Sequence, residues 1–225
     1  MALILNLETA TKTCSVALAQ DSEIVAVEEF TSEKFSHAEK LNLFIQKVLE
    51  SANFSMKDLD AVAVSAGPGS YTGLRIGAST AKGICYALDI PLISINSLKA
   101  LANMAETGDS LICPMFDARR MEVYAAVYDS DLNTIQSTNA VVVDDESFAD
   151  FLKEKQVIFM GPGAEKCKEV LKADNAIFDL STPVSAKGMA SLSYEKFKAN
   201  EFEDVAYFEP AYLKDFVAGK PKKLI

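Results

Sequence analysis

Apolar and polar residues alternate along the first third of the chain in a pattern that predicts three strands and a helix. Residues 3–7 and 14–19 are short apolar runs on either side of a polar turn, and residues 23–30 alternate apolar and polar positions. Both features are typical of antiparallel strands. Apolar residues then recur at helical spacing after Ser36, a candidate N-cap whose capping box would be completed by Glu39. The first third therefore predicts a three-stranded meander and a helix with one buried face.

A glycine-rich loop follows the next apolar run and leads into a second helix. Residues 61–66 predict a buried strand, and Gly67-Pro68-Gly69 predicts a sharp turn at its carboxyl end. Ser70 or Thr72 can cap the helix. The Walker motif is absent because Gly73 is followed by Leu-Arg, and the glycines are too widely spaced for the dinucleotide fingerprint. The loop is therefore either a plain strand-to-helix turn or an anion site built from free N–H groups.

The same order of elements restarts near residue 111, which predicts a duplicated α/β fold. The first half continues with a strand at 91–95 and a helix at 97–106. The second half has strands at 111–116, 121–128 and 132–143, a helix at 147–155, a strand at 157–160, the turn Gly161-Pro-Gly163 and a further helix. A last helix is expected at 186–199, before an irregular C-terminal segment. We expect an N-terminal subdomain over 1–108 and a reduced C-terminal one over 109–225.

Composition and charge narrow the class of protein. The 225 residues are 49% hydrophobic and 24% charged, as in an ordinary globular protein. The apolar runs are far shorter than the roughly 20 residues that cross a bilayer, and the acidic start does not resemble a signal peptide. A net charge of −10 argues against the chain alone binding a phosphate backbone, and the basic Lys220-Pro-Lys-Lys223 predicts a solvated end. We expect a cytoplasmic protein that does not associate with membranes.

Cysteine and histidine usage argues against a metal centre. Cys14, Cys85, Cys113 and Cys167 are scattered singly, without the paired spacing of metal sites, so they predict buried thiols. His37 is the only histidine, which excludes a two-histidine metal site within one chain. A Ser-His-Asp mechanism would also depend on His37, and no Gly-x-Ser-x-Gly elbow is present. We expect no catalytic residue, metal or other cofactor.

The segment Gly67-Pro-Gly-Ser-Tyr-Thr-Gly-Leu-Arg-Ile-Gly77 resembles the signature of the TsaB (YeaZ) family. These proteins are non-catalytic paralogues of TsaD and help to make threonylcarbamoyladenosine in transfer RNA. Similar segments follow the family order: Ile4-Leu-Asn-Leu-Glu-Thr-Ala10, Cys14-Ser-Val-Ala-Leu18, His37-Ala-Glu39 with Leu41, and Asp117-Ala-Arg-Arg120 with Glu122-Val-Tyr124. The resemblance covers most of the chain and is weakest between about residues 133 and 200. It departs from the family at Glu8, where Asp is usual.

The resemblance implies the actin/Hsp70/sugar-kinase-like (ASKHA) fold, in which two subdomains each hold a mixed sheet and helices. In active members of that fold, two hairpin acids attend metal and phosphate, and a glycine turn holds adenosine. By analogy, a vestigial nucleotide or anion site would comprise the hairpin and glycine-turn residues Glu8, Thr9, Thr11, Gly67, Gly69, Ser70, Asp117, Gly161 and Gly163. The short second half offers little to enclose adenosine, so we interpret these residues as inherited framework.

The resemblance also implies a partner interface, because TsaB-family proteins pair through their first two helices with themselves or with TsaD. Beside its core stripe, the helix at 72–88 carries a second stripe of small or apolar residues, whereas a solvated face would normally carry charge. A helix buried within its own domain would show the same stripe. The expected interface residues are His37, Leu41, Leu43, Tyr71, Thr72, Arg75, Ile76, Ser79, Thr80, Gly83 and Ala87.

The function implied by the resemblance is that of a non-catalytic accessory subunit. It would be required for threonylcarbamoylation of the adenosine adjacent to the anticodon, in a complex with a TsaD-like transferase and a TsaE-like ATPase. Alone it would form a homodimer, and it would meet transfer RNA only through the complex. One alternative is a stand-alone enzyme of the same fold, either an ATP-dependent small-molecule kinase or a metalloprotease. Another is a homodimeric module that binds a small anion at Ser70–Gly73.

Overall fold

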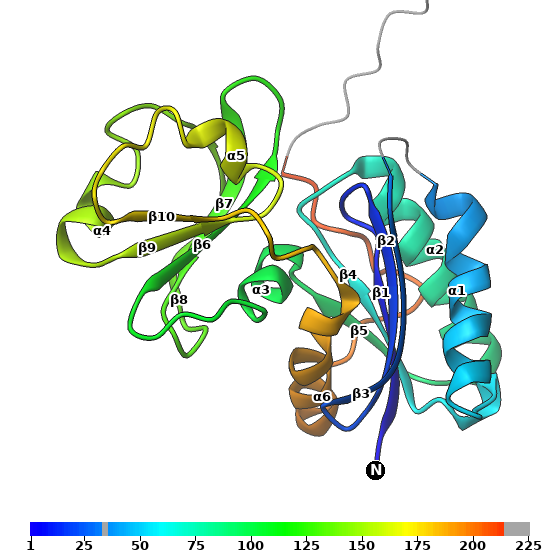
Figure 1. Cartoon of the computed structure of the whole chain (residues 1–225). Coiled ribbons are helices and arrows are strands. Elements are labelled where there is room, and N and C mark those ends of the chain that lie inside the picture. Colours follow the sequence, from blue (N-terminus) through cyan, green and yellow to red (C-terminus); the bar gives the residue numbers. More distant parts are fainter. Residues whose placement is uncertain (33–35, 214–225) are drawn as a thin grey trace, which may run out of the picture.

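The first half of the chain forms a five-stranded sheet with helices on both faces (Figure 1). The computed structural model describes residues 1–32 and 36–213. The strands are β1 (Leu3–Glu8), β2 (Thr13–Gln20), β3 (Glu23–Thr31), β4 (Ala61–Ser65) and β5 (Leu92–Ile95), in the order β3-β2-β1-β4-β5. β1, β2 and β3 pair antiparallel, whereas β4 and β5 extend the sheet parallel to β1. The predicted meander is confirmed.

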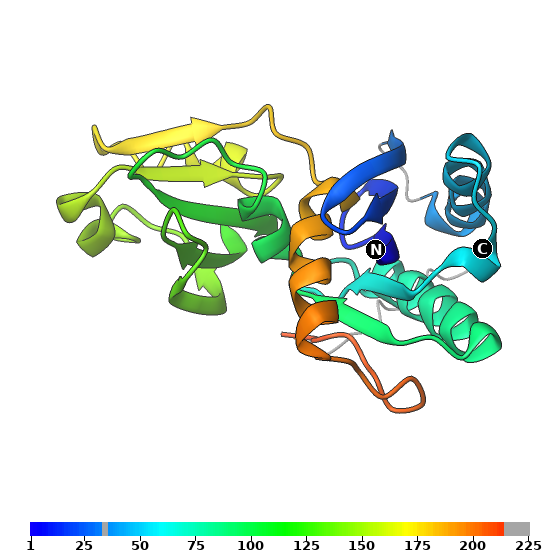
Figure 2. The same ribbon diagram turned by 90° about the horizontal axis from the view of Figure 1, so that it is seen from below.

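The alternation of side chains along β1 gives this sheet two separate cores. Leu3, Leu5 and Leu7 pack on one face against α1 (His37–Ser51) and α2 (Tyr71–Leu88). On the other face, Ile4 packs with residues of α3 (Ser97–Ala102) and of the turn η2 (Ala186–Met189), which leads into α6 (Ala190–Ala199). Figure 2 shows α6 between the first sheet and the second half, with α1 and α2 on the side away from it. The α1–α2 pair is therefore the outer layer of the first half.

The second half repeats the strand order of the first. Its strands are β6 (Leu111–Asp117), β7 (Glu122–Tyr128), β8 (Thr134–Val142), β9 (Val157–Met160) and β10 (Ala176–Asp179), in the order β10-β9-β6-β7-β8. The helices over one face are short: α4 (Ala149–Glu154) and α5 (Ala164–Cys167). Sequence patterns predicted this half apart from β10, whose four residues do not alternate. Each half thus places a hairpin, β1–β2 or β6–β7, in the same position of its sheet.

After the second sheet the chain returns to the first half. η2 and α6 contact the first sheet, Glu203 bridges to Leu92 of β5, and the N–H of Ala211 donates to the Ala66 carbonyl at 2.8 Å. The division at 108/109 stays a proposal, and these contacts favour assigning the segment from η2 onward to the first subdomain. The basic segment 220–223 lies outside the described residues. Among the residues that are described, no helix is both long and apolar enough to span a membrane.

Of the two N-cap predictions, the one for the helix after Ser36 is wrong and the one for α2 is confirmed. The capping box at Ser36 and Glu39 does not form: Ser36 has a ψ of 16° rather than extended geometry, and its side chain makes no capping hydrogen bond. Its backbone carbonyl instead accepts from the N–H groups of Glu39 and Lys40, both at 3.1 Å. Ser70 caps α2 as predicted, because its Oγ accepts a hydrogen bond from the Gly73 N–H at 3.3 Å.

Candidate functional site

Two glycines bring α2 against the end of β1. The Cα of Gly73 lies so close to the Thr9 carbonyl that a Cβ would overlap it, and a Cβ at Gly77 would overlap the Thr9 Oγ1. Side chains at either position would push the helix outward. Because the helix lies so close, Leu74, Ala78, Ala81 and Cys85 are buried along its sheet-facing stripe, as the sequence predicted. The opposite side of α2 is left at the surface of the chain.

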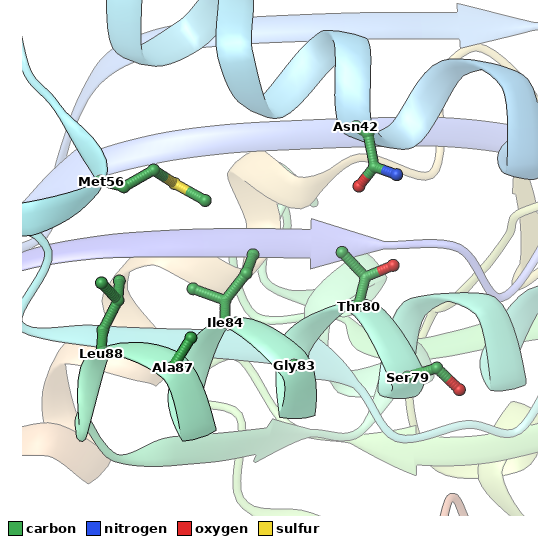
Figure 3. A pocket seen from close by; sticks show the side chains of 8 residues that line it. All are labelled: Asn42, Met56, Ser79, Thr80, Gly83, Ile84, Ala87 and Leu88. Carbon is green, nitrogen blue, oxygen red and sulfur yellow. The ribbon is translucent and has the colours of Figure 1, made fainter.

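An open groove runs between α1 and α2 on this surface (Figure 3). Its volume is about 430 Å³, and its lining residues are Asn42, Met56, Ser79, Thr80, Gly83, Ile84, Ala87 and Leu88. Figure 3 shows Asn42 and Met56 reaching towards α2, whose Ile84 and Leu88 point back towards them. A second groove of about 330 Å³ shares Asn42, Met56 and Ile84 with the first. The two together form one mostly apolar channel along the helix pair.

Four of the predicted interface residues, Ser79, Thr80, Gly83 and Ala87, line this groove. At Gly83 no described atom lies within 4 Å of the position that a Cβ would take. The exposed small-residue stripe is therefore not packed inside the described part of the chain. Other predicted residues do not line the groove but are at least partly accessible: Thr72 and Arg75 are exposed, Tyr71 and Ile76 are half-buried, and Leu43 is 55% exposed.

Two predicted interface residues are wrong as direct partner contacts. Leu41 is 1% exposed and belongs to the core beneath α1. His37 is also 1% exposed; its Nε2 lies 2.8 Å from the Thr11 carbonyl, and its ring packs on Gly73. Burial lowers the pKa of His37, despite the hydrogen bond with Thr11 that favours its charged form. His37, the first residue of α1, therefore contacts both the first hairpin and α2 within the interior of the fold.

Sequence reasoning missed four lining residues of the groove and one neighbour of the start of α2. Ile84 and Leu88 follow Thr80 at four-residue spacing, a signal that could have extended the stripe. Asn42 and Met56 come from other elements and gave no such signal. The neighbour is Tyr212, which stacks near Tyr71 with ring centroids 4.9 Å apart, while the Arg75 guanidinium lies 4.2 Å from the Tyr71 ring. The chain's described C-terminal end therefore borders the start of α2.

The acid of the first hairpin is sealed inside the fold. Glu8 is fully buried, and its Oε1 accepts a hydrogen bond from the Ala10 N–H at 2.6 Å. Its Oε2 has no hydrogen-bond partner among the described residues. Burial raises the pKa of Glu8 to about 7, although the hydrogen bond from the Ala10 N–H opposes the shift. At neutral pH, Glu8 is therefore divided between its protonated and ionised forms.

The acid of the second hairpin is instead near the surface and paired. The Lys166 ammonium, carried by α5, donates to Asp117 Oδ1, and the Arg119 N–H donates to the same oxygen at 2.9 Å. Partial burial acts to raise the pKa of Asp117, but the hydrogen bond and charge of Lys166 outweigh it and lower the pKa. Asp117 is therefore ionised and already has a cation.

Both glycine turns are filled by the protein's own backbone. A Cβ at Gly69 would overlap the Ala10 carbonyl, and the Ser70 N–H donates to that carbonyl at 2.6 Å. A Cβ at Gly67 would lie 2.8 Å from the Ala211 carbonyl. In the second half, the Gly163 N–H donates to the Met115 carbonyl at 2.8 Å. The N–H groups of Ser70 and Gly163 thus bond within the chain, and the Gly73 N–H donates to the Ser70 Oγ. The engagement of the Ser70 and Gly73 donors argues against an anion module at Ser70–Gly73.

Taken together, these residues do not fit the nucleotide and metal of active ASKHA proteins. Glu8 is buried, and Asp117, whose side chain is 54% exposed, is already paired with Lys166. The turn at Gly161 and Gly163 packs on the backbone of β6 and on Leu101. No three His, Cys, Asp or Glu side chains cluster as metal ligands within residues 1–32 and 36–213. The four cysteines, as predicted, are free and buried.

Comparisons with known proteins match the chain to two families that act on the same modified nucleoside, TsaD and TsaB. A family model described as TsaD, tRNA N6-adenosine threonylcarbamoyltransferase, matches residues 29–222. The tRNA threonylcarbamoyladenosine biosynthesis protein TsaB of Escherichia coli is 30% identical over 227 residues, which cover 96% of each chain. The chain belongs to the TsaB family. The TsaB protein of Bacillus subtilis is 33% identical over 176 residues, 75% of each chain.

Solved structures of the TsaB family extend the match to the fold. YeaZ from Pseudomonas aeruginosa aligns with a TM-score of 0.78 at 25% identity, over 95% of this chain and 100% of that one. The duplicated order of the two sheets and this match confirm the predicted ASKHA fold. The family resemblance first indicated by the glycine loop at 67–77 is likewise confirmed.

Proposed function

We propose that this TsaB-family chain is a cytosolic accessory subunit in the biosynthesis of threonylcarbamoyladenosine on transfer RNA. In this proposal it has no catalytic activity of its own and binds a TsaD-like transferase through the α1–α2 groove. A TsaE-like ATPase joins the pair, and the transferase modifies the adenosine adjacent to the anticodon. Family membership supports the pathway, since its relatives are named as biosynthesis proteins of this modified nucleoside. The geometry of the groove supports the mode of binding.

The observation that carries the proposal is the open groove along α2, whose lining residues between Ser79 and Leu88 carry no charge. Thr80, Gly83 and Ala87 present little side-chain bulk there, and the channel beside them is lined mostly by apolar atoms. Small residues allow a second helix to approach closely, and removal of the apolar lining from water favours association. The same surface would pair two copies of the chain when the transferase is absent.

The hairpins argue against the rival enzymes. A kinase of this fold would need carboxylates open to metal and phosphate, whereas Glu8 is buried and Asp117 is paired with Lys166. A metalloprotease would need a cluster of metal ligands, and the described residues contain none. The kinase alternative predicts ATP turnover by the pure chain that Asp117→Ala abolishes, whereas our proposal predicts no turnover. With a net charge of −10, contacts to transfer RNA are assigned to the complex.

Substitution of Gly83 by arginine tests the groove. The Gly83→Arg variant should fold, because the position is open and Arg forms helix better than Gly. A long cation in an apolar helix contact costs several kcal/mol, so affinity for the TsaD-like protein should fall by about 100-fold or more. Pull-down, light scattering and a reconstituted modification assay would measure the loss of the heterodimer, homodimer and activity.

A matched control is available on the opposite face of the first sheet. Ala199 is a small, exposed residue at the end of α6, so Ala199→Arg adds the same charge away from the groove. This variant should bind and self-associate like the wild type. If Gly83→Arg keeps its circular-dichroism spectrum and still binds, the interface lies elsewhere. If it unfolds, the stripe contributes to the chain's own core.

A further inference from the structure

Lys166 occupies a position at the second hairpin where three oxygen atoms converge. The short helix α5 follows the turn at Gly161 and lies beside the β6–β7 hairpin in Figure 1. From there the Lys166 Nζ donates to Asp117 Oδ1, to the Arg120 carbonyl at 2.7 Å and to the Glu122 carbonyl at 2.7 Å. A lysine ammonium has three N–H donors, and this arrangement uses all of them.

The oxygen atoms around this ammonium are of the kind that bind hard divalent cations. Carboxylate and backbone carbonyl oxygens are the ligands that Ca²⁺ and Mg²⁺ take in proteins. The hairpin backbone is shaped around the same point, because Arg119 and Arg120 have positive φ values of 73° and 50°. Such values are uncommon for residues other than glycine. They occur beside the Arg120 carbonyl that faces Lys166, so the hairpin closes around a cation supplied by its own chain.

We propose that the Lys166 ammonium is a built-in substitute for a divalent cation at the second hairpin. It satisfies Asp117 and the two carbonyls, fixes the hairpin without a bound ligand and closes this acid to metal and phosphate. The inference goes beyond the proposed accessory function and does not depend on any partner. It follows that removal of Lys166 opens a divalent-cation site that the wild-type chain lacks.

An ordinary surface salt bridge in the same half provides the comparison. Lys153 and Asp150 pair at 3.1 Å on α4, but their side chains are 73% and 95% exposed. In the Lys166–Asp117 pair, the lysine side chain is 24% exposed and holds two carbonyls as well. Exposed pairs of the first kind contribute little to stability. Lys153→Ala is therefore the matched control for the same substitution at Lys166.

The test measures thermal unfolding of the full chain with and without millimolar Ca²⁺, against NaCl of equal ionic strength. We expect Lys166→Ala to lower the melting temperature by about 3–6 °C and Lys153→Ala to leave it unchanged. Ca²⁺ should recover part of the loss in Lys166→Ala but should not move the wild type. The double variant Lys166→Ala/Asp117→Asn should not respond to Ca²⁺. Lys166→Met, which keeps the apolar stem, separates loss of packing from loss of the ammonium.

The outcomes divide cleanly. The proposal is supported if Ca²⁺ raises the melting temperature only when Lys166 is absent and Asp117 is present. Destabilisation of both Lys166 variants without any Ca²⁺ response would make Lys166 a structural clamp only and overturn the proposal. A Ca²⁺ response of the wild type, or no effect of either Lys166 variant on melting, would overturn it as well.

Discussion

The two hairpin acids occupy equivalent positions in the two sheets but are neutralised in different ways. Glu8 ends β1 and pairs across its hairpin with Ser15, and Asp117 ends β6 and pairs with Val123. Glu8 is buried with its pKa raised to about 7, so a proton neutralises much of its charge. Asp117 keeps its charge and is paired with Lys166.

The helices above each hairpin explain the difference. In the first half, Gly73 and Gly77 let the long α2 close over the end of β1, so Glu8 loses its contact with water. In the second half, α5 has four residues, and the side chain of Asp117 stays 54% exposed. An equivalent place in a duplicated fold therefore does not preserve chemistry. The first half gains an outer helix pair, which is the partner surface that we propose, whereas the second keeps a short framework.

The largest effect on stability is expected from Glu8→Gln. Burial raises the pKa of Glu8 from its ordinary value of 4.5 to about 7, so the folded state binds this proton more tightly than the unfolded state. The corresponding stability is present below pH 4.5 and is lost as pH rises to about 7, a change of about 3 kcal/mol at most. Glutamine does not titrate and still accepts from the Ala10 N–H. Urea unfolding at several pH values would measure the free energy of unfolding of both proteins. As pH rises from 5 to 8, this free energy should increase for Glu8→Gln relative to the wild type.

His37 also affects the pH dependence of stability, in the direction opposite to Glu8. Burial lowers its pKa, so its contribution to stability is lost as pH falls below its ordinary value of 6.5, the opposite direction. This contribution is common to the wild type and Glu8→Gln, and it cancels in their difference. If the two stability curves run parallel between pH 5 and 8, Glu8 does not carry the raised pKa.

A smaller effect of opposite pH dependence is expected from Asp117→Asn. The lowered pKa of Asp117 means that its ion pair contributes stability above the ordinary value of 3.8, and that this is lost as pH falls further. Because more than half of the Asp117 side chain is exposed, the loss at pH 7 should be less than about 1 kcal/mol. Urea unfolding at pH 7 and below pH 4 would measure it. If Asp117→Asn lowers the free energy of unfolding by more than Glu8→Gln changes it at any pH, the expected order of the two effects is wrong.

Much of the fold was predictable because its signals are local. Alternation over residues 23–30, the run at 61–66 and the Gly-Pro-Gly turns each depend on neighbouring residues, and their repetition predicted the duplication. β10 was not predicted because four residues are too few to show the alternation that indicates a strand. The Ser36 cap was wrong because a cap requires extended backbone geometry as well as the right residue type, and Ser36 has a ψ of 16°.

The candidate site was less predictable because its contacts join distant segments. Lys166 reaches Asp117 across 49 residues, and Tyr212 reaches Arg75 across 137. No periodicity encodes such pairs. Leu41 shows a different limit: the helical spacing already placed it on the core stripe, yet the family resemblance added it to the interface. Burial decides between the two, and it places Leu41 in the core.

The smallest effect is expected on RNA binding by two exposed arginines of the second hairpin. Arg119 and Arg120 are exposed at the hairpin tip, whereas the first hairpin presents Lys12. Binding to transfer RNA depends mainly on neutralising several phosphates, and a net charge of −10 opposes this at long range. Filter binding by the pure chain at physiological salt should therefore show no saturation, and Arg119→Ala/Arg120→Ala should not differ from the wild type. Addition of a TsaD-like partner should restore binding. If the pure chain binds tightly and the double variant does not, the second hairpin is itself an RNA site, and it is more than a framework closed by Lys166.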